Sequence, residues 1–158
     1  ATDYQGPVYI RLGRAETKDI QDDSYHFEWG KAEVLRQGSD VTIFATGIMT
    51  AKALDAAETL AKQGVQAEVI NVHTIKPLDE ETVIASAKKT GKVVTAEEHS
   101  IIGGLGSAVA EVLARQCPTK QAFVGVQDSF GESGSPNDLL EKYGLTTEAI
   151  VKAAVGLQ

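Results

Sequence analysis

Residues 92–113 read KVVTAEEHSIIGGLGSAVAEVL and contain the change of pattern that decides the fold. After Lys92, residues 93–96 are apolar or β-branched, which predicts a strand covered on both faces, as in a parallel sheet. A loop rich in glycine follows, and apolar residues then recur with helical spacing from Ala108 to Leu113. A buried strand, a short loop and a helix are typical of a βα unit.

The same alternation of strand-like and helix-like runs continues on both sides, from Trp29 to the end of the chain. We therefore predict an α/β fold, a three-layer α/β/α sandwich around a mostly parallel sheet. The strand at 31–36 is predicted to be antiparallel, because only a tight turn at 38–40 separates it from the next strand. The predicted strands are 31–36, 41–45, 67–72, 92–96 and 122–126, and the predicted helices cover 49–61, 79–90, the region of 108–113, 138–143 and 147–155.

Composition limits the function classes. The 158 residues contain 15 Lys+Arg and 22 Asp+Glu, a formal net charge of −7. This excess of acid argues against nucleic acid or an anionic membrane surface as the main partner. The single cysteine excludes an internal disulfide and a zinc site built on several thiolates. No apolar run approaches the ~20 residues of a membrane span and no signal peptide is visible, so we expect a cytoplasmic protein.

The carboxyl ends of the predicted parallel strands are where an open α/β sheet binds ligands. The most distinctive of these ends carries the acidic cluster Glu97, Glu98 and His99, followed by Gly103, Gly104 and Gly106. One interpretation is a crevice in which the backbone N–H groups of the helix start attract an anion and His99 moves a proton. The other interpretation is a tight strand-to-helix connection whose histidine lies at an interface, and this second interpretation is favoured because a glycine-rich turn alone is weak evidence.

Three familiar site types fit poorly. A dinucleotide fingerprint needs Gly or Ala where this chain has Val109, although Asp128, after the next strand, keeps that hypothesis open. A hydrolase elbow needs one more residue between Ser133 and the following glycine. The three histidines are isolated, without the spacing of metal ligands. Near the amino terminus, Arg11 and Arg14 could hold a phosphate, but on pattern alone they are expected to be solvated surface residues.

Four stretches in order resemble the C-terminal domain of transketolase-type thiamine diphosphate enzymes. They are Gly38–Ile43 with Ala45–Gly47, Val69–Val72 with Thr74–Asp79, Val94–His99 with Gly103–Gly106, and Phe130–Gly134. Together they cover residues 29 to 156 almost continuously. Transketolase, 1-deoxyxylulose-5-phosphate synthase and the beta subunits of 2-oxo-acid dehydrogenases share the first three. The fourth, preceded by Asp128 and Ser129, is similar to the transketolase version, and the short spacing resembles a split transketolase made of two polypeptides.

The resemblance implies a division of the chain into three parts. Residues 1–14 would be a remnant of the last strand of the preceding pyrimidine-binding domain, residues 15–28 a linker, and residues 29–158 the C-terminal domain. We expect the chain, which begins with Ala1, to be a piece of a longer polypeptide. By position, Arg14 matches an arginine that contacts the sugar-phosphate substrate, and Arg11 is a weaker candidate for the same patch.

For function, the resemblance implies ketol transfer between sugar phosphates by an intact dimeric enzyme that uses thiamine diphosphate and Mg²⁺. The chain has no Gly-Asp-Gly motif, and the glutamate that activates the cofactor would lie upstream of it, so we expect no cofactor, metal or catalytic residue on this chain alone. Its expected partners are the N-terminal part of transketolase and a dimer mate. Glu98, His99 and the glycine loop are assigned to packing or the dimer interface first. The alternatives are the C-terminal domain of a 1-deoxyxylulose-5-phosphate synthase or of a 2-oxo-acid dehydrogenase beta subunit, and, from another class, a stand-alone small-anion-binding module.

Overall fold

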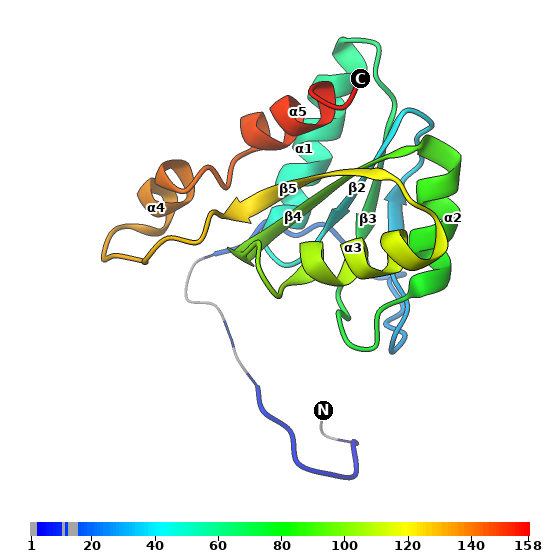
Figure 1. The fold of residues 1–158 in the computed structure, drawn as a ribbon. Coiled ribbons are helices and arrows are strands. Elements are labelled where there is room, and N and C mark those ends of the chain that lie inside the picture. Colours follow the sequence, from blue (N-terminus) through cyan, green and yellow to red (C-terminus); the bar gives the residue numbers. More distant parts are fainter. Residues whose placement is uncertain (1–2, 11, 13–15) are drawn as a thin grey trace.

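The computed structural model describes residues 3–10, 12 and 16–158 of the chain. A five-stranded sheet forms the middle layer of the fold, with helices on both of its faces (Figure 1). The predicted α/β sandwich is therefore confirmed. The elements are β1 (Glu33–Arg36), β2 (Val41–Ala45), α1 (Met49–Lys62), β3 (Ala67–Asn71), α2 (Glu80–Thr90), β4 (Lys92–Ser100), α3 (Leu105–Gln116), β5 (Lys120–Val126), α4 (Pro136–Lys142) and α5 (Thr147–Val155).

The strand order is β1-β3-β2-β4-β5, with β3, β2, β4 and β5 parallel and β1 antiparallel. The antiparallel direction of β1 is confirmed, but the reason given for it from the sequence is wrong. β1 does not form a hairpin with β2. It pairs with β3, where Glu33 lies opposite Asn71. The turn after β1 crosses the start of β3, because Ser39 and Asp40 donate their N–H groups to the carbonyl of Gln66 at 3.0 and 2.9 Å.

Two separate hydrophobic cores lie on the two faces of the sheet. On one face, α1 and α5 pack against residues such as Ile43 and Val94. On the other face, α2 and α3 pack against residues such as Phe44 and Val93. Ile43 and Phe44 are adjacent in sequence, as are Val93 and Val94. The two members of each pair point to opposite faces because side chains alternate along a strand. All five residues of β2 are buried, which matches a strand covered on both sides and explains its nearly continuous apolar sequence.

The start of α2 is fixed by Asp79, a side chain only 5% exposed. Its carboxylate accepts hydrogen bonds from the backbone N–H of Thr82 at 3.2 Å and from the Thr82 hydroxyl at 2.8 Å. It also accepts one from the N–H of Ala32 at 2.9 Å, so the same side chain ties the chain before β1 to α2. Burial alone would raise the pKa of Asp79, but these hydrogen bonds and the charge of Lys31 outweigh it and hold the pKa below its ordinary value.

We expect Asp79→Asn to lower the free energy of unfolding at pH 7 by about 1 to 2 kcal/mol, as for other lost helix caps. Because folding lowers the pKa of Asp79, its contribution is complete above the unfolded-state pKa of about 4 and is lost as the pH falls through the folded-state pKa. Urea unfolding between pH 7 and pH 2 would measure this. The variant should lose less stability in acid than the unchanged chain, and equal acid sensitivity of the two proteins would contradict the assignment.

The described residues near the amino terminus lie outside the sheet. Pro7–Ile10 and Leu12 form no strand, although their sequence is strand-like, and they are exposed. A strand needs a neighbour to accept its hydrogen bonds, and the sheet of the described residues ends at β1 and β5. The proposed division into 1–14, 15–28 and 29–158 stays a prediction. Among the described residues, no helix is long and apolar enough to span a bilayer.

Candidate functional site

The topological switch point of this sheet, where a crevice is expected, lies at the carboxyl ends of β2 and β4, which are neighbours. β2 leads into α1 on one face, whereas β4 leads into α3 on the other face. Their connections therefore diverge, and a divergence of this kind is where open α/β sheets usually hold a ligand. The N–H of Thr46, just after β2, donates to the carbonyl of Ala96 on β4 at 3.1 Å and holds the two strand ends together.

A bulge in β4 lies at this end of the strand, between Ala96 and Ser100. Ala96 pairs with Val124 and Ser100 pairs with Val126, so four steps on β4 oppose two steps on β5. The two extra residues fall among Glu97, Glu98 and His99. Bulges re-aim side chains at the rims of functional sites. β4 thus runs beyond its predicted end at residue 96, and the alternation of side chains along it places one acidic side chain on the same face as Val93, toward α3.

That side chain is Glu97, which is buried, with 2% of its surface exposed. Its two carboxylate oxygens accept hydrogen bonds from the backbone N–H groups of Leu105 at 2.7 Å and Gly106 at 2.8 Å. Both donors belong to the first turn of α3, where N–H groups lack partners within the helix and the helix dipole favours negative charge. The N–H groups that the less favoured interpretation of the sequence gave to an external anion thus already bind an internal one.

The glycines of the loop make room for this arrangement. A Cβ atom at Gly104 would lie 2.9 Å from Nδ1 of His99 and closer still to the Glu97 carboxylate, and one at Gly106 would lie 2.5 Å from the Phe123 ring. Gly103 has a φ of 78°, in the left-handed region that favours glycine, and its N–H donates to the Ser107 hydroxyl at 2.8 Å. Close packing at Gly104 and Gly106, and the left-handed backbone at Gly103, therefore account for the three glycines without an external ligand.

The two polar residues selected from the sequence, Glu98 and His99, lie on the outer surface of the bulge. Glu98 is exposed, and 62% of the His99 side chain is exposed. Nδ1 of His99 lies 2.9 Å from the carbonyl oxygen of Ser100 and 3.9 Å from the Glu97 carboxylate. A carbonyl can only accept, so this hydrogen bond places a proton on Nδ1 and leaves Nε2 as the acceptor of the neutral ring. Their assignment to an interface stays a prediction.

Arg11 and Arg14, the candidate substrate-binding residues, lie outside the described residues, so their assignment also stays a prediction. Sequence reasoning missed Glu97 as a site residue in its own right, although it belongs to the acidic cluster. The signal was its place directly after a buried strand and shortly before a helix that begins with glycine. Such a helix has no side chain of its own to cap its first turn, so an acid from elsewhere is favoured.

A second feature is the long exposed loop after β5, where all residues from 127 to 138 are exposed. Phe130 is 99% exposed, the most exposed of the large hydrophobic residues described. Asp128 has a φ of 48°, the one positive φ among the described residues other than glycine. The loop and α4 project beyond the end of the sheet (Figure 1). Exposed apolar groups and strained backbone on one loop are typical of a recognition surface.

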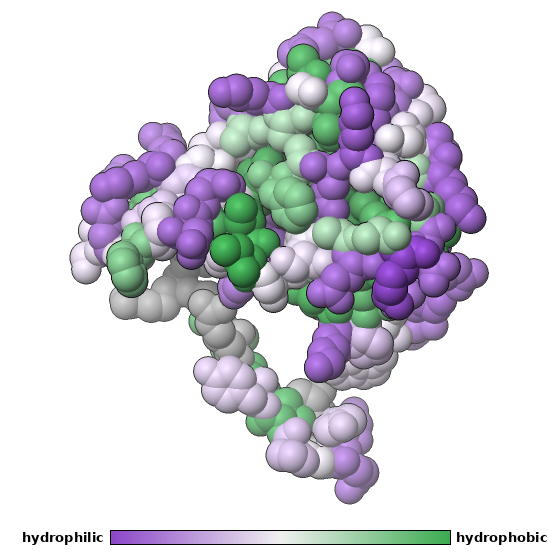
Figure 2. Space-filling view, in the orientation of Figure 1, coloured by the Kyte–Doolittle hydropathy of each residue, from purple (hydrophilic) through white to green (hydrophobic). Residues whose placement is uncertain are grey.

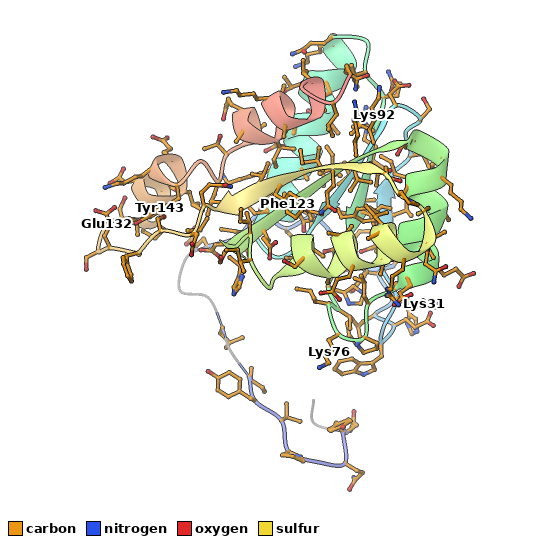
Figure 3. The ribbon with its side chains drawn as sticks, in the orientation of Figure 1. Lys31, Lys76, Lys92, Phe123, Glu132 and Tyr143 are labelled. Carbon is orange, nitrogen blue, oxygen red and sulfur yellow. The ribbon has the colours of Figure 1, made fainter. Side chains whose placement is uncertain are left out.

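This loop is nevertheless braced. The hydroxyl of Tyr143 donates to the carbonyl of Phe130 at 2.9 Å and lies 3.2 Å from the Glu132 carboxylate, which pairs with Lys142 at 2.6 Å (Figure 3). The hydrogen bond and charge of Lys142 lower the pKa of Glu132, and Glu132 in turn raises the pKa of Lys142. Partial burial and the Glu132 carboxylate raise the pKa of Tyr143. The brace holds the backbone carbonyl of Phe130, while the Phe130 side chain stays exposed.

We expect Tyr143→Phe to loosen this loop without unfolding the domain, because the hydroxyl is the group that holds the Phe130 carbonyl. Limited proteolysis with chymotrypsin should cleave after Phe130 severalfold faster in the variant, since cleavage follows local opening. Circular dichroism would check that the fold is retained. An unchanged rate of cleavage after Phe130 would show that the hydroxyl does not hold the loop.

Comparison with known proteins identifies the class to which this fold belongs. Residues 30–150 match the family described as the C-terminal domain of transketolase. The chain belongs to this family, and the predicted resemblance is confirmed. A solved structure described as a split gene transketolase, an inactive beta4 tetramer, superimposes with a TM-score of 0.93 at 52% identity, over 99% of this chain and 51% of that one.

Relatives in two enzyme groups share the sequence. The 6-deoxy-6-sulfo-D-fructose transketolase subunit SqwH of Clostridium sp. (strain MSTE9) is 59% identical over 151 residues, which are 96% of this chain and 47% of that protein. The 1-deoxy-D-xylulose-5-phosphate synthase of Desulforudis audaxviator (strain MP104C) is 40% identical over 158 residues, 98% of this chain and 25% of that enzyme. The chain spans about half the length of the transketolase subunits that it matches.

Proposed function

We propose that this chain is the C-terminal domain of a split transketolase, a cytoplasmic enzyme that transfers a two-carbon ketol unit between sugar phosphates. The observation that carries the proposal is the family match over residues 30–150, joined to 59% identity with a transketolase subunit. The fourth sequence motif, Phe130–Gly134, favours the same branch. The relative SqwH is named as a subunit of a 6-deoxy-6-sulfo-D-fructose transketolase, so a sulfonated ketose belongs among the donors to test.

In this proposal the cofactor is bound outside the chain. Thiamine diphosphate and Mg²⁺ need ligands for a metal and donors for a diphosphate. The described residues include no group of three or more His, Cys, Asp or Glu that could hold a metal ion. Of the two helix starts at the carboxyl ends of β2 and β4, that of α3 has its N–H groups on Glu97. Both observations support a cofactor site outside the chain, and the domain is proposed to serve packing, dimerisation and, through Arg14 and Arg11, the edge of the substrate site.

The projecting loop is the proposed contact with the N-terminal part of the enzyme. Phe130 has almost no surface covered within the chain, and residues 127–138 around it are exposed. Burying a phenylalanine side chain is worth about 1.5 to 3 kcal/mol. Tyr143 already braces this loop, although the described part of the chain leaves it uncovered. A partner that covers such a loop gains more binding free energy, because little conformational entropy is lost on binding.

The test is a reconstitution assay. The chain alone should give no ketol transfer and no heat when thiamine diphosphate and Mg²⁺ are titrated into it, whereas addition of the N-terminal part should give turnover. Phe130→Ser should raise the chain concentration needed for half-maximal activity at least about 10-fold. Val155→Ser is the matched control, because Val155 is also apolar and 45% exposed but lies on α5. Turnover by the chain alone would refute the proposal.

A second candidate is the C-terminal domain of a 1-deoxyxylulose-5-phosphate synthase, favoured by the 40% identity to such an enzyme over nearly the whole chain. The same reconstituted mixture separates the two. Formation of 1-deoxy-D-xylulose 5-phosphate, with no ketol transfer from a ketose phosphate or a sulfonated ketose, would select the synthase.

A further inference from the structure

The edge of the sheet at β5 is open. Within the described part of the chain, β5 pairs with β4 alone, so its other side presents backbone N–H and C=O groups without strand partners. The opposite edge, β1, has only four residues, carries Glu33 and Arg36, and is irregular in register, and all three features discourage pairing with another chain. β5 has seven residues and contains neither an acidic residue nor a proline.

Grooves flank β5 on both faces of the sheet. One, of about 490 Å³, lies between β5 and α5 and includes Lys152 and Ala153 in its wall. The other, of about 260 Å³, lies between β5 and α3 and includes Ala110 and Ala114. Phe123, 37% exposed, borders both. Figure 2 shows apolar surface gathered over the middle of β5, where Figure 3 places Phe123 in front of the sheet.

We infer that the edge of β5 binds the β5 of a second copy of this chain, antiparallel across a two-fold axis at Phe123. Two five-stranded sheets would then form one continuous sheet, and the two Phe123 rings would meet between the grooves. In this register Lys120 lies opposite Val126 of the other copy. This inference rests on the proposed function for the identity of the partner, a second copy of the chain, and it adds the surface through which the two copies would bind. Its test measures association instead of activity, so the two proposals can fail separately.

Charge along the edge favours the antiparallel arrangement. The amino end of β5 is basic, because the exposed Lys120 lies beside Lys92 in the ladder with β4. The carboxyl end is acidic, with Asp128 and Glu98 both exposed. An antiparallel pair brings the basic end of one copy to the acidic end of the other, whereas a parallel pair would oppose like charges. An antiparallel two-fold contact also closes on itself, so it stops at a dimer.

Sedimentation velocity tests the association. The chain should change from monomer to dimer over an about 100-fold range of concentration, because dimerisation follows mass action. Phe123→Asp should raise the dissociation constant at least about 30-fold, and Lys120→Glu about 10-fold, since each change occurs twice in the dimer. Lys120 is exposed, so Lys120→Glu tests the contact without disturbing the core. Val34→Asp, on the exposed surface of β1, is the matched control and should leave the dissociation constant unchanged.

Disulfide formation tests the register. In a Cys117→Ser background, Phe123→Cys should cross-link two copies on mild oxidation, because directly opposed residues have Cα atoms about 4.5 to 5.5 Å apart, within disulfide range. Lys120→Cys, on the same strand, should not cross-link, because the two-fold axis separates its copies by about 20 Å. A chain that stays monomeric throughout overturns the inference. So does a dimer that Val34→Asp weakens as much as Phe123→Asp does, or equal cross-linking of the two cysteine variants.

Discussion

Glu97→Ala is expected to lower the free energy of unfolding by about 3 kcal/mol, because it leaves two buried N–H groups without acceptors and a cavity where the side chain was. The acceptors lost are those of Leu105 and Gly106. For a domain of this size, that loss corresponds to a fall of about 10 °C in the melting temperature. Urea unfolding followed by circular dichroism would measure it, with the largest local change in hydrogen exchange at the start of α3.

Two companion experiments separate the cap from the cavity. Glu97→Gln keeps the shape and one oxygen acceptor, so it should lose less, about 1 to 2 kcal/mol. Acetate added to Glu97→Ala should restore part of the stability, because a small carboxylate fits the vacated donors, whereas acetate should not stabilise the unchanged chain. An alanine variant within about 0.5 kcal/mol of the unchanged chain would show that Glu97 does not cap α3.

Gly38→Ala is expected to lower the free energy of unfolding by at least about 3 kcal/mol or to prevent folding, because a side chain at this position would overlap neighbouring backbone atoms. A Cβ atom there would lie inside van der Waals contact with the backbone of Ala67 and Glu68, closer than the 3.0 Å that real Cβ atoms respect. Backbone cannot rotate away as a flexible side chain can. The start of β3 would have to move, and the hydrogen bonds from Ser39 and Asp40 to Gln66 would be lost.

Gly47→Ala is the matched control for that experiment. Gly47 has a φ of 58°, but nothing lies within 4 Å of the place where a Cβ would stand. Its substitution should therefore cost only the conformational term, about 1 to 2 kcal/mol. Equilibrium unfolding of both variants gives the comparison. If Gly38→Ala were no more destabilising than Gly47→Ala, close approach of the turn to β3 would not be what requires glycine at residue 38.

Local signals in the sequence predicted most of the fold. α2 was found because acidic residues mark its start and Gly91, in the left-handed conformation, marks its end. The buried strands were found because β2 and β4 are apolar on both faces. The partner of β1 was not predictable in this way. Loop length alone suggested a hairpin with β2, whereas the actual pairing depends on how β3 returns beside β2, which is a property of the whole topology.

The candidate site was predicted only in part, for a similar reason. The sequence identified the right segment, but it selected Glu98 and His99, which are exposed, over Glu97, which is buried. The prediction ended the strand at residue 96, whereas β4 continues to Ser100, so the alternation that places Glu97 on the α3 face with Val93 was not applied to it. The open edge at β5 was likewise invisible, because whether a strand lies at an edge depends on strand order and not on its own residues.

The Glu97 carboxylate at the start of α3 should also decide how the domain responds to free anions around it. A carboxylate attached to the neighbouring strand and held in the right geometry has an effective molarity far above the concentration of any metabolite. A sugar phosphate or free phosphate near α3 would have to compete with Glu97 on those terms. The start of α3 should thus keep one structure while metabolite levels rise and fall, which would suit the packing role proposed for this domain.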